Sequence, residues 1–234
     1  LQVSKNNKIL LITDASTLAA TNHTLKAKNY FNKFNYQEVD NCKLNKFKSK
    51  SDLLDTFYSN GIIYFTGGHQ SYLKYKISSL EKKLGINLSN VLQQYLQNGG
   101  VIGGTSAGAS ILGKKMPTGL FSSLRTEKTY LNKNYTIDIP IYKVSNSLNL
   151  LPYIIDQHFT QKNRHHRGIA MAIDNKIRVL GIDEDTAIYN KYGTEKIYII
   201  GKNHVTVYDG SQISYYRDNK NKKIFVNNFS FDKL

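Results

Sequence analysis

A serine flanked by glycines follows a short apolar pair near the middle of the chain. Residues 101–113 read VIGGTSAGASILG, and Ser106 lies between Gly104 and Gly108 in the pattern G-x-S-x-G. Glycine removes side chains where the backbone must bend sharply or approach another segment closely. A serine nucleophile on a sharp strand-to-helix turn needs such a backbone, and the amide of Ala107 would then be placed to stabilise an oxyanion. An anion-binding turn or close packing of a strand on a helix explains the glycines as well.

A serine nucleophile also needs a base and an acidic group that orients the base. His158 follows the apolar residues Ile154 and Ile155, so it ends a predicted strand. In a parallel sheet that strand can bring His158 to the same edge as Ser106. Asp183, Glu184 and Asp185 place three consecutive carboxylates at the end of another apolar stretch, where an acidic group could orient the base. A charged surface turn explains the three acids equally well.

Cationic side chains follow the histidine. Arg164 and Arg167 are three residues apart on a predicted helix and so share one face, with Lys162 close by. Guanidinium groups in this arrangement can hold the carboxylates of a substrate. The ordinary alternative is a solvated helix face.

The order of predicted elements indicates the fold class. Strands and helices alternate in the first half of the chain, which predicts an α/β fold with a mostly parallel sheet and helices on both faces. The strands are predicted at 8–13, 36–40, 61–66 and 101–102, and the helices at 17–33, 51–59, 73–84 and 88–98. Short antiparallel strands are predicted at 177–182, 187–189, 197–200, 205–208, 215–216 and 224–226. No linker or repeat interrupts the chain, so we expect one domain over residues 1–234.

The composition is that of a basic, ordered protein. The 234 residues include 32 Lys and Arg against 17 Asp and Glu, a formal net charge of +15. The lysines are scattered and no reading module is recognisable, so we expect no nucleic-acid partner. No apolar stretch can span a bilayer, and residues 1–13 contain no apolar core with a small-residue cleavage site. We therefore expect a cytoplasmic protein without a membrane partner.

The sequence contains few residues that could bind a metal or form a disulfide. Cys42 is the only cysteine, so no intramolecular disulfide and no cysteine-based metal spacing exist. His158, His165 and His166 lie close together, but the acidic and cysteine ligands expected for zinc are missing nearby. We expect neither a metal nor an organic cofactor.

Four motifs occur in one order along residues 8–190. They are FTGGHQ at 65–70, GGTSAGA at 103–109, DQHF at 156–159 followed by KNRHHR, and GIDEDTA at 181–187. Together they resemble cyanophycinase and its relatives among the S51-type serine peptidases. The order serine, histidine, glutamate differs from that of the usual α/β-hydrolases, which supports this resemblance.

The resemblance implies a fold like that of the class I glutamine amidotransferases. It implies an exopeptidase that releases β-aspartyl-arginine dipeptides from cyanophycin, an aspartate backbone that bears arginine on its side-chain carboxyl groups. Ser106 would be the nucleophile, His158 the base and then the acid, and Glu184 the group that orients His158. Amides near Gly68 and Ala107 would form the oxyanion hole. The implied substrate-binding residues are Gln70, Asp156, Gln157, Lys162, Arg164 and Arg167. Relatives are often dimers, so a homodimer is a further expectation.

Three departures from the family pattern keep other functions open. The family's GGDQ reads GGHQ here, with His69 in place of the carboxylate, and Lys162 stands where an arginine is usual. The chain also starts almost at the strand near Lys8, so we expect it to lack the family's first strand. One alternative is an aspartyl or isoaspartyl dipeptidase of the same family. Another is a non-catalytic protein that binds an acidic polymer.

Overall fold

The computed structural model describes residues 7–16, 21–34, 36, 38–118, 134–138, 142–221, 223–227 and 232–233. These residues form two compact units, each described here by itself. Unit 1 comprises residues 1–112 and 147–150, and unit 2 comprises residues 113–146 and 151–234. The expectation of one domain over residues 1–234 stays a prediction. No helix among the described residues is both long and apolar enough to cross a membrane.

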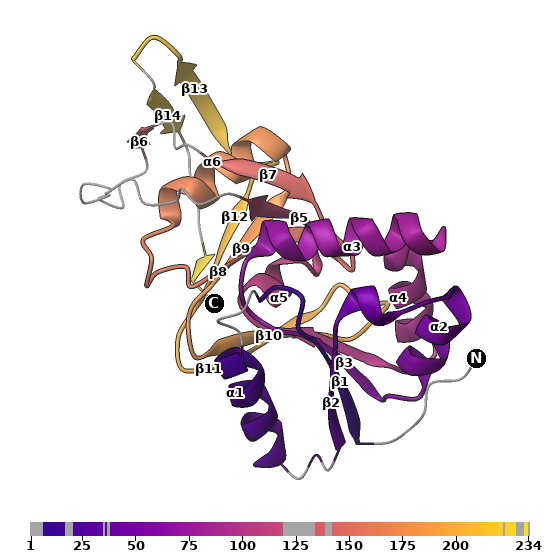
Figure 1. The fold of residues 1–234 in the computed structure, drawn as a ribbon. Coiled ribbons are helices and arrows are strands. Elements are labelled where there is room, and N and C mark those ends of the chain that lie inside the picture. Colours follow the sequence, from indigo (N-terminus) through magenta and orange to yellow (C-terminus); the bar gives the residue numbers. More distant parts are fainter. Residues whose placement is uncertain are drawn as a thin grey trace. The chain divides into compact units, whose positions relative to one another are not determined.

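Unit 1 is built on a four-stranded parallel sheet in the order β2-β1-β3-β4 (Figure 1). Its strands are β1 (Lys8–Ile12), β2 (Glu38–Cys42), β3 (Ile62–Phe65) and β4 (Val101–Gly104). β1 lies inside the sheet and reads KILLI, with its last four side chains buried. Continuous apolar residues are typical of a parallel strand that is covered on both faces.

Helices connect these strands, and Figure 1 shows α1 and α3 on opposite sides of the sheet. Right-handed crossovers require this, because β1 leads to a neighbour on one side and β3 to a neighbour on the other. The elements are α1 (Thr21–Asn32), the 3-10 helix η2 (Leu44–Lys46), α2 (Lys50–Tyr58), α3 (Gln70–Leu84), α4 (Leu88–Gln97) and α5 (Ala107–Ser110). Residues 17–20 of the predicted first helix lie outside the described residues.

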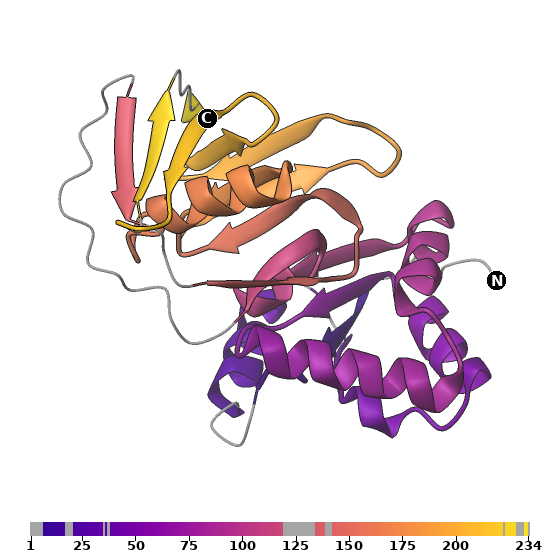
Figure 2. The same cartoon turned by 90° about the horizontal axis from the view of Figure 1, so that it is seen from above.

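Unit 2 contains a six-stranded sheet in the order β15-β12-β9-β8-β5-β7. Its strands are β5 (Gly113–Thr118), β7 (Lys143–Asn146), β8 (Leu151–Gln157), β9 (Arg178–Ile182), β12 (Val205–Asp209) and β15 (Asp232–Lys233). β8 is parallel to β5 and to β9, and the other pairs are antiparallel. Helix α6 (His165–Asn175) connects β8 to β9 and packs on the sheet (Figure 2).

Two smaller sheets complete unit 2. β10 (Thr186–Asn190) and β11 (Ile197–Gly201) form an antiparallel hairpin, and β13 (Ser214–Asp218), β14 (Lys223–Asn227) and β6 (Asn134–Asp138) form an antiparallel sheet. The antiparallel strands expected in the last third are thus confirmed, with one exception. The strand near 177–182 pairs parallel with β8 on one side, because α6 returns the chain in the same direction.

Asp14 is a buried carboxylate at the carboxyl end of β1. The residue is 1% exposed, and its Oδ2 accepts a hydrogen bond from the main-chain amide of Leu44 at 2.7 Å. Burial raises the pKa of Asp14, and the Leu44 hydrogen bond and the nearby Lys43 amine only partly offset this effect. The folded protein therefore binds a proton at Asp14 more readily than the unfolded chain does.

We expect Asp14→Asn to change how stability depends on pH. In the wild type the pKa of Asp14 is higher in the folded protein than in the unfolded chain. The free energy of unfolding therefore falls as the pH rises from the pKa of the unfolded chain toward that of the folded protein. The side-chain oxygen of the asparagine still accepts from the Leu44 amide, but the asparagine does not titrate. The stability of the variant relative to the wild type should therefore be greater at pH 7 than at pH 4. Urea unfolding at both pH values measures the difference. Asp55→Asn, on the exposed side of α2, is the control, and an equal gain there would contradict the prediction.

Candidate active site

Ser106 stands between β4 and α5 in a backbone conformation that serine rarely adopts. Its φ is 52° and its ψ is −117°, outside the regions favoured by residues that carry a Cβ. Strain of this kind costs about 1–3 kcal/mol and persists only where the surrounding structure imposes it. The sharp strand-to-helix turn that the sequence predicts is present at this serine.

Glycines make this turn sterically possible. A Cβ on Gly108 would lie 2.0 Å from the carbonyl oxygen of Phe65, and a Cβ on Gly104 would lie 2.3 Å from that of Gly108. Both distances are far inside van der Waals contact. The amide of Thr105 also donates to the Phe65 carbonyl at 3.1 Å. The first turn of α5 therefore packs directly on the end of β3.

A second glycine turn lies against Ser106. A Cβ on Gly67 would be 3.2 Å from the Ser106 Cβ and 3.8 Å from its Oγ. Gly68 has a φ of 145°, and a Cβ there would lie 2.1 Å from the carbonyl oxygen of Ala15. The segments after β1, β3 and β4 thus meet at one edge of the unit 1 sheet. The oxyanion-hole role of the Gly68 and Ala107 amides, which belong to these turns, stays a prediction.

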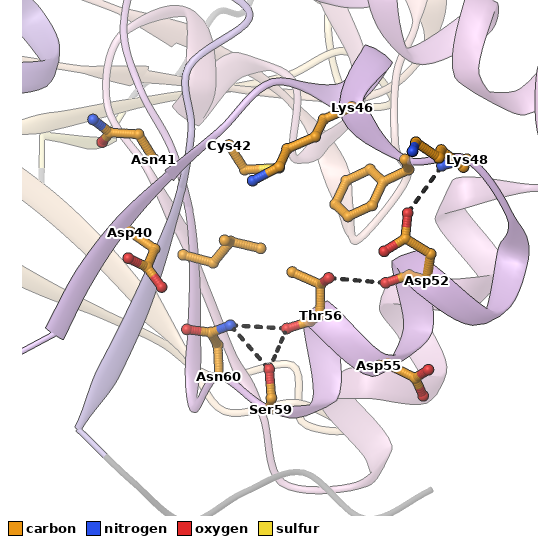
Figure 3. Close-up of a pocket in the computed structure, with 12 residues that line it drawn as sticks. Asp40, Asn41, Cys42, Lys46, Lys48, Asp52, Asp55, Thr56, Ser59 and Asn60 are labelled. Atoms are coloured by element: carbon orange, nitrogen blue, oxygen red, sulfur yellow. Dashed lines mark hydrogen bonds between the residues drawn. The ribbon is translucent and has the colours of Figure 1, made fainter.

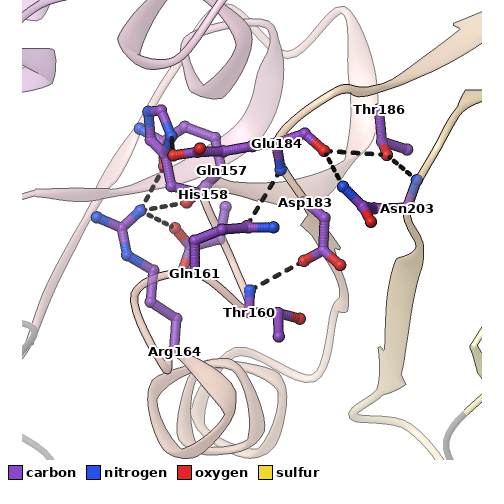
Figure 4. A network of polar contacts seen from close by, with 10 residues as sticks. Gln157, His158, Thr160, Gln161, Arg164, Asp183, Glu184, Thr186 and Asn203 are labelled. Carbon is purple, nitrogen blue, oxygen red and sulfur yellow. Dashed lines mark hydrogen bonds and ion pairs between the residues drawn. The ribbon is translucent and has the colours of Figure 1, made fainter.

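His158 and Glu184 are paired in unit 2 (Figure 4). The His158 Nδ1 lies 2.8 Å from the Glu184 Oε1. A carboxylate at Nδ1 favours the tautomer that carries its proton there, and it directs the lone pair of the neutral ring to Nε2. This is the orientation that a histidine needs to act as a general base through Nε2.

The register of two parallel strands brings this pair together. Gln157 at the end of β8 lies opposite Ile182 at the end of β9. Because parallel strands end at the same edge, the next residues of both strands emerge side by side. His158 takes a left-handed conformation with a φ of 51°, and the Phe159 amide donates to the Ile182 carbonyl at 3.2 Å.

Asp156, two residues before His158, joins two arginines in a buried ion cluster. Arg167 Nε donates to Asp156 Oδ2 at 2.8 Å, and Arg164 Nη1 donates to Asp156 Oδ1 at 3.0 Å. Asp156 is fully buried, and each arginine is less than 10% exposed. Burial lowers the pKa of the Arg164 guanidinium, and the Asp156 carboxylate opposes this effect. The cluster combines two positive charges with one negative charge.

These contacts revise one interpretation of the basic segment. A solvated helix face is wrong for Arg164 and Arg167, because their side chains are buried and bonded to Asp156. Gln157 belongs to the same cluster, since its Oε1 accepts from Arg164 Nη1 at 2.7 Å. A role for these residues in binding substrate stays a prediction. Lys162 is exposed, and its proposed role is likewise untested.

The remaining predicted residues lie in unit 1. His69 is the exposed N-cap residue of α3, and Gln70 is the first residue of that helix and is half-buried. Ser106 follows β4 in the sheet of unit 1, whereas His158 follows β8 in the sheet of unit 2. The two residues therefore do not share a sheet edge, contrary to the expectation from sequence. Their pairing in one catalytic site stays a prediction.

Two residues that the sequence analysis missed hold the main chain of Glu184. Gln161 Oε1 accepts from the Glu184 amide, and Asn203 Nδ2 donates to the Glu184 carbonyl (Figure 4). Neither belongs to a recognisable motif, and Asn203 is distant from Glu184 in sequence. No pattern in the sequence singled them out.

Histidine, cysteine and acidic side chains do not gather into a metal site in the described part of the chain. Within that part, no group of three or more His, Cys, Asp or Glu side chains is arranged to hold a metal ion. His165 Nδ1 instead lies 2.6 Å from the hydroxyl of Tyr208.

A pocket of about 780 Å³ in unit 1 is lined by residues of β2, η2 and α2 (Figure 3). It contains none of the predicted site residues, and burial raises the pKa of its Cys42 thiol to about 11.

Comparison with known proteins assigns the family. Residues 1–198 match the family described as peptidase family S51. This chain belongs to peptidase family S51. The S51 assignment agrees with the resemblance carried by the four sequence motifs.

Curated relatives in the match are cyanophycinases. The chain is 32% identical to the cyanophycinase of Geminocystis herdmanii over 157 residues, which cover 65% of this chain and 51% of that protein. It is 28% identical to the cyanophycinase of Trichormus variabilis over 157 residues, which cover 65% of this chain and 46% of that protein. The matched segment thus spans about half the length of these relatives.

Solved structures support the fold. A peptidase from an acI-B1 Actinobacterium aligns with a TM-score of 0.56 at 18% identity, over 97% of this chain and 83% of that one. A protein described as a peptidase E from Listeria monocytogenes aligns with a TM-score of 0.54 at 16% identity, over 85% of this chain and 88% of that one. The predicted α/β fold class, like that of the class I glutamine amidotransferases, is confirmed.

The strain at Ser106 predicts an unusual order of stability between two variants. Glycine normally costs about 0.5–1 kcal/mol relative to alanine inside regular structure. At a φ of 52° and a ψ of −117°, the glycine relieves strain that alanine retains. We expect Ser106→Gly to be more stable than Ser106→Ala by about 1 kcal/mol in urea unfolding. A more stable alanine variant would show that the turn is unstrained.

The buried ion cluster predicts a large loss of stability when its carboxylate is removed. Asp156→Asn leaves two buried guanidinium groups without an anionic partner, which costs about 3–5 kcal/mol. Arg178→Gln breaks an exposed ion pair with Asp209 and is expected to cost less than about 1 kcal/mol. Urea unfolding of the two variants compares these values. Similar losses would mean that burial does not determine the strength of the Asp156 cluster.

Proposed function

We propose that this protein is a serine-type peptidase in which Ser106 is the nucleophile and His158 is its general base. The observation that carries the proposal is the hydrogen bond between His158 Nδ1 and Glu184 Oε1 at 2.8 Å. A histidine oriented in this way accepts a proton at Nε2, which is what activation of a serine hydroxyl requires. The strained turn at Ser106 and membership of family S51 support the proposal.

The reaction runs through two steps. Ser106 Oγ attacks the scissile carbonyl while its proton passes to His158, and the amides of Gly68 and Ala107 stabilise the oxyanion. The protonated His158 then gives this proton to the leaving amine, and an acyl-enzyme forms on Ser106. Water, deprotonated by His158, attacks the acyl carbon; the bond to Ser106 Oγ breaks, His158 returns the proton to this oxygen, and the second product leaves as the acid. Glu184 keeps its hydrogen bond to Nδ1 and stabilises the imidazolium.

The substrate class we propose is a β-aspartyl peptide, with cyanophycin as the first polymer to test. The matched relatives are named cyanophycinases, and cationic side chains suit aspartyl carboxylates. Lys162 is an exposed cation close to His158 in sequence and supports a substrate that carries carboxylates. His69, exposed at the start of α3, replaces an acidic group of the family pattern. An aspartyl dipeptide therefore serves as the competing substrate.

The proposed function predicts which substrate is cleaved and which serine is needed. Purified protein is incubated with cyanophycin, β-Asp-Arg and α-Asp dipeptides, and the products are identified by mass spectrometry. We expect release of β-Asp-Arg from the polymer. Ser106→Ala should lose about 10⁶-fold in kcat, and Glu184→Gln about 10⁴-fold. Cleavage of dipeptides alone would favour the dipeptidase.

Ser110→Ala is the matched control for the serine variant. Ser110 is fully buried in α5, and its hydroxyl has no hydrogen-bond partner among the described residues. Its removal should leave both folding and activity unchanged. Equal loss of activity in the two serine variants would contradict the assignment of Ser106. A folded protein that cleaves none of the substrates and does not react with a fluorophosphonate would favour a non-catalytic binding protein.

A further inference from the structure

The carboxylate of Glu184 is held in place although little packs around it. Its side chain is 53% exposed, compared with 30% for His158. An exposed glutamate samples many rotamers, and ordering such a side chain costs free energy. A short bond to His158 Nδ1 therefore requires that the main chain of Glu184 be fixed in position.

The two neighbouring strand ladders do not fix Glu184. The pairing of β8 with β9 ends at Gln157 and Ile182, and the pairing of β10 with β11 begins at Thr186 and Gly201. Glu184 lies between these ladders. It precedes Asp185, whose φ of 54° turns the chain sharply. Contacts outside the ladders must hold this residue.

Two side-chain amides supply these contacts, one at each end of the Glu184 residue (Figure 4). Gln161 Oε1 accepts a hydrogen bond from the Glu184 amide at 3.1 Å. Asn203 Nδ2 donates to the Glu184 carbonyl oxygen at 2.8 Å. The hydroxyl of Thr186 also donates to this carbonyl at 3.3 Å and accepts from the main-chain N–H of Asn203 at 3.1 Å. Both hydrogen-bonding groups of the Glu184 main chain are thus engaged by side chains.

The two amides connect Glu184 to segments that are themselves fixed. Gln161 lies in the turn that starts at His158, and the Lys162 amide closes this turn by donating to the His158 carbonyl at 3.1 Å. One turn therefore carries both the histidine and the group that holds its partner. Asn203 lies between β11 and β12, next to Lys202, whose amide donates to the Asp185 carbonyl at 2.9 Å.

We propose that Gln161 and Asn203 are positioning residues that hold the main chain of Glu184 so that its carboxylate keeps His158 in the Nδ1-protonated tautomer. This inference rests on the proposed function, because the tautomer matters only if His158 acts as a base. Asn203 also lies beyond the residues 1–198 that match family S51. The clamp formed by Gln161 and Asn203 thus includes a part of the chain outside the family match.

The test replaces both amides by apolar groups of similar shape, in the double variant Gln161→Met with Asn203→Leu. Both residues are exposed, so the fold should survive, which thermal unfolding checks. Long-range ¹H–¹⁵N correlation spectra report which ring nitrogen of His158 carries the proton, and His158→Gln identifies its signals. We expect the wild type to show the Nδ1-protonated ring, and the double variant and Glu184→Gln each to shift toward the Nε2-protonated form.

Asn190 provides the matched control. Its side-chain amide donates to the carbonyl oxygens of Thr194 and Lys196 at 2.9 and 2.7 Å, at the other end of the β10–β11 hairpin. Asn190→Leu also removes two hydrogen bonds between a side-chain amide and the main chain and should leave the tautomer unchanged. An unchanged tautomer in the double variant, or an equal shift in the Asn190 variant, would overturn the proposal.

Activity adds a second readout that separates the two proposals. We expect the double variant to lose about 10²-fold in kcat with little change in KM, since a small displacement of a catalytic group is enough for such a loss. If the wild type cleaves no substrate but the tautomer responds as expected, the peptidase assignment fails and the clamp stands. If the wild-type ring is not protonated at Nδ1, both proposals fail.

Discussion

The parallel register of β8 and β9 is the constraint on which the candidate chemistry of unit 2 depends. Asp156 lies opposite Gly181 and Gln157 opposite Ile182, so the residues that follow emerge at one edge. A slip by one residue would turn every side chain to the other face of the sheet. The fully buried Asp156 would then face away from α6, which carries Arg167. Burial of Asp156 and the meeting of His158 with Glu184 are therefore consequences of one register.

In unit 1 the main constraint is the packing that keeps Ser106 in a strained backbone conformation. The conformation of Ser106 is unfavourable by itself. It is imposed by packing, because Gly108 brings α5 against the Phe65 carbonyl and Gly67 closes over the serine. A methyl group at Gly108 would separate α5 from β3. The glycines therefore matter for the space they leave empty as much as for their backbone freedom.

Much of this architecture follows from sequence, because its signals are local. The apolar run at Lys8–Ile12, the periodic leucines of α3 and the turn at Ser106 each depend on neighbouring residues. The pairing of His158 with Glu184 also follows, since both come after apolar strands. β5 was missed because GKKMPT carries two lysines and a proline in a strand of six residues, and only its neighbours β7 and β8 make it a strand.

Tertiary contacts account for the other differences. Nothing in KNRHHR distinguishes a buried arginine from an exposed one, and only the carboxylate of Asp156 makes burial of Arg164 and Arg167 tolerable. Asn203 was invisible for a similar reason, because its partner Glu184 is brought close by the hairpin between them. Sequence patterns thus predict the pairing of His158 with Glu184, whereas the side chains that hold the Glu184 main chain are identified only in the folded structure.

The excess positive charge of the Asp156 cluster explains why it extends toward His158. One carboxylate cannot neutralise two guanidinium groups, so Arg164 needs further acceptors. It finds them in the side-chain oxygen and the main-chain carbonyl of Gln157, the residue directly before the histidine. An apolar cluster of the same volume would often be as stable, but it would place no constraint on the Gln157 carbonyl. The buried charge costs stability, but its hydrogen bonds to Gln157 fix the end of β8, directly before His158.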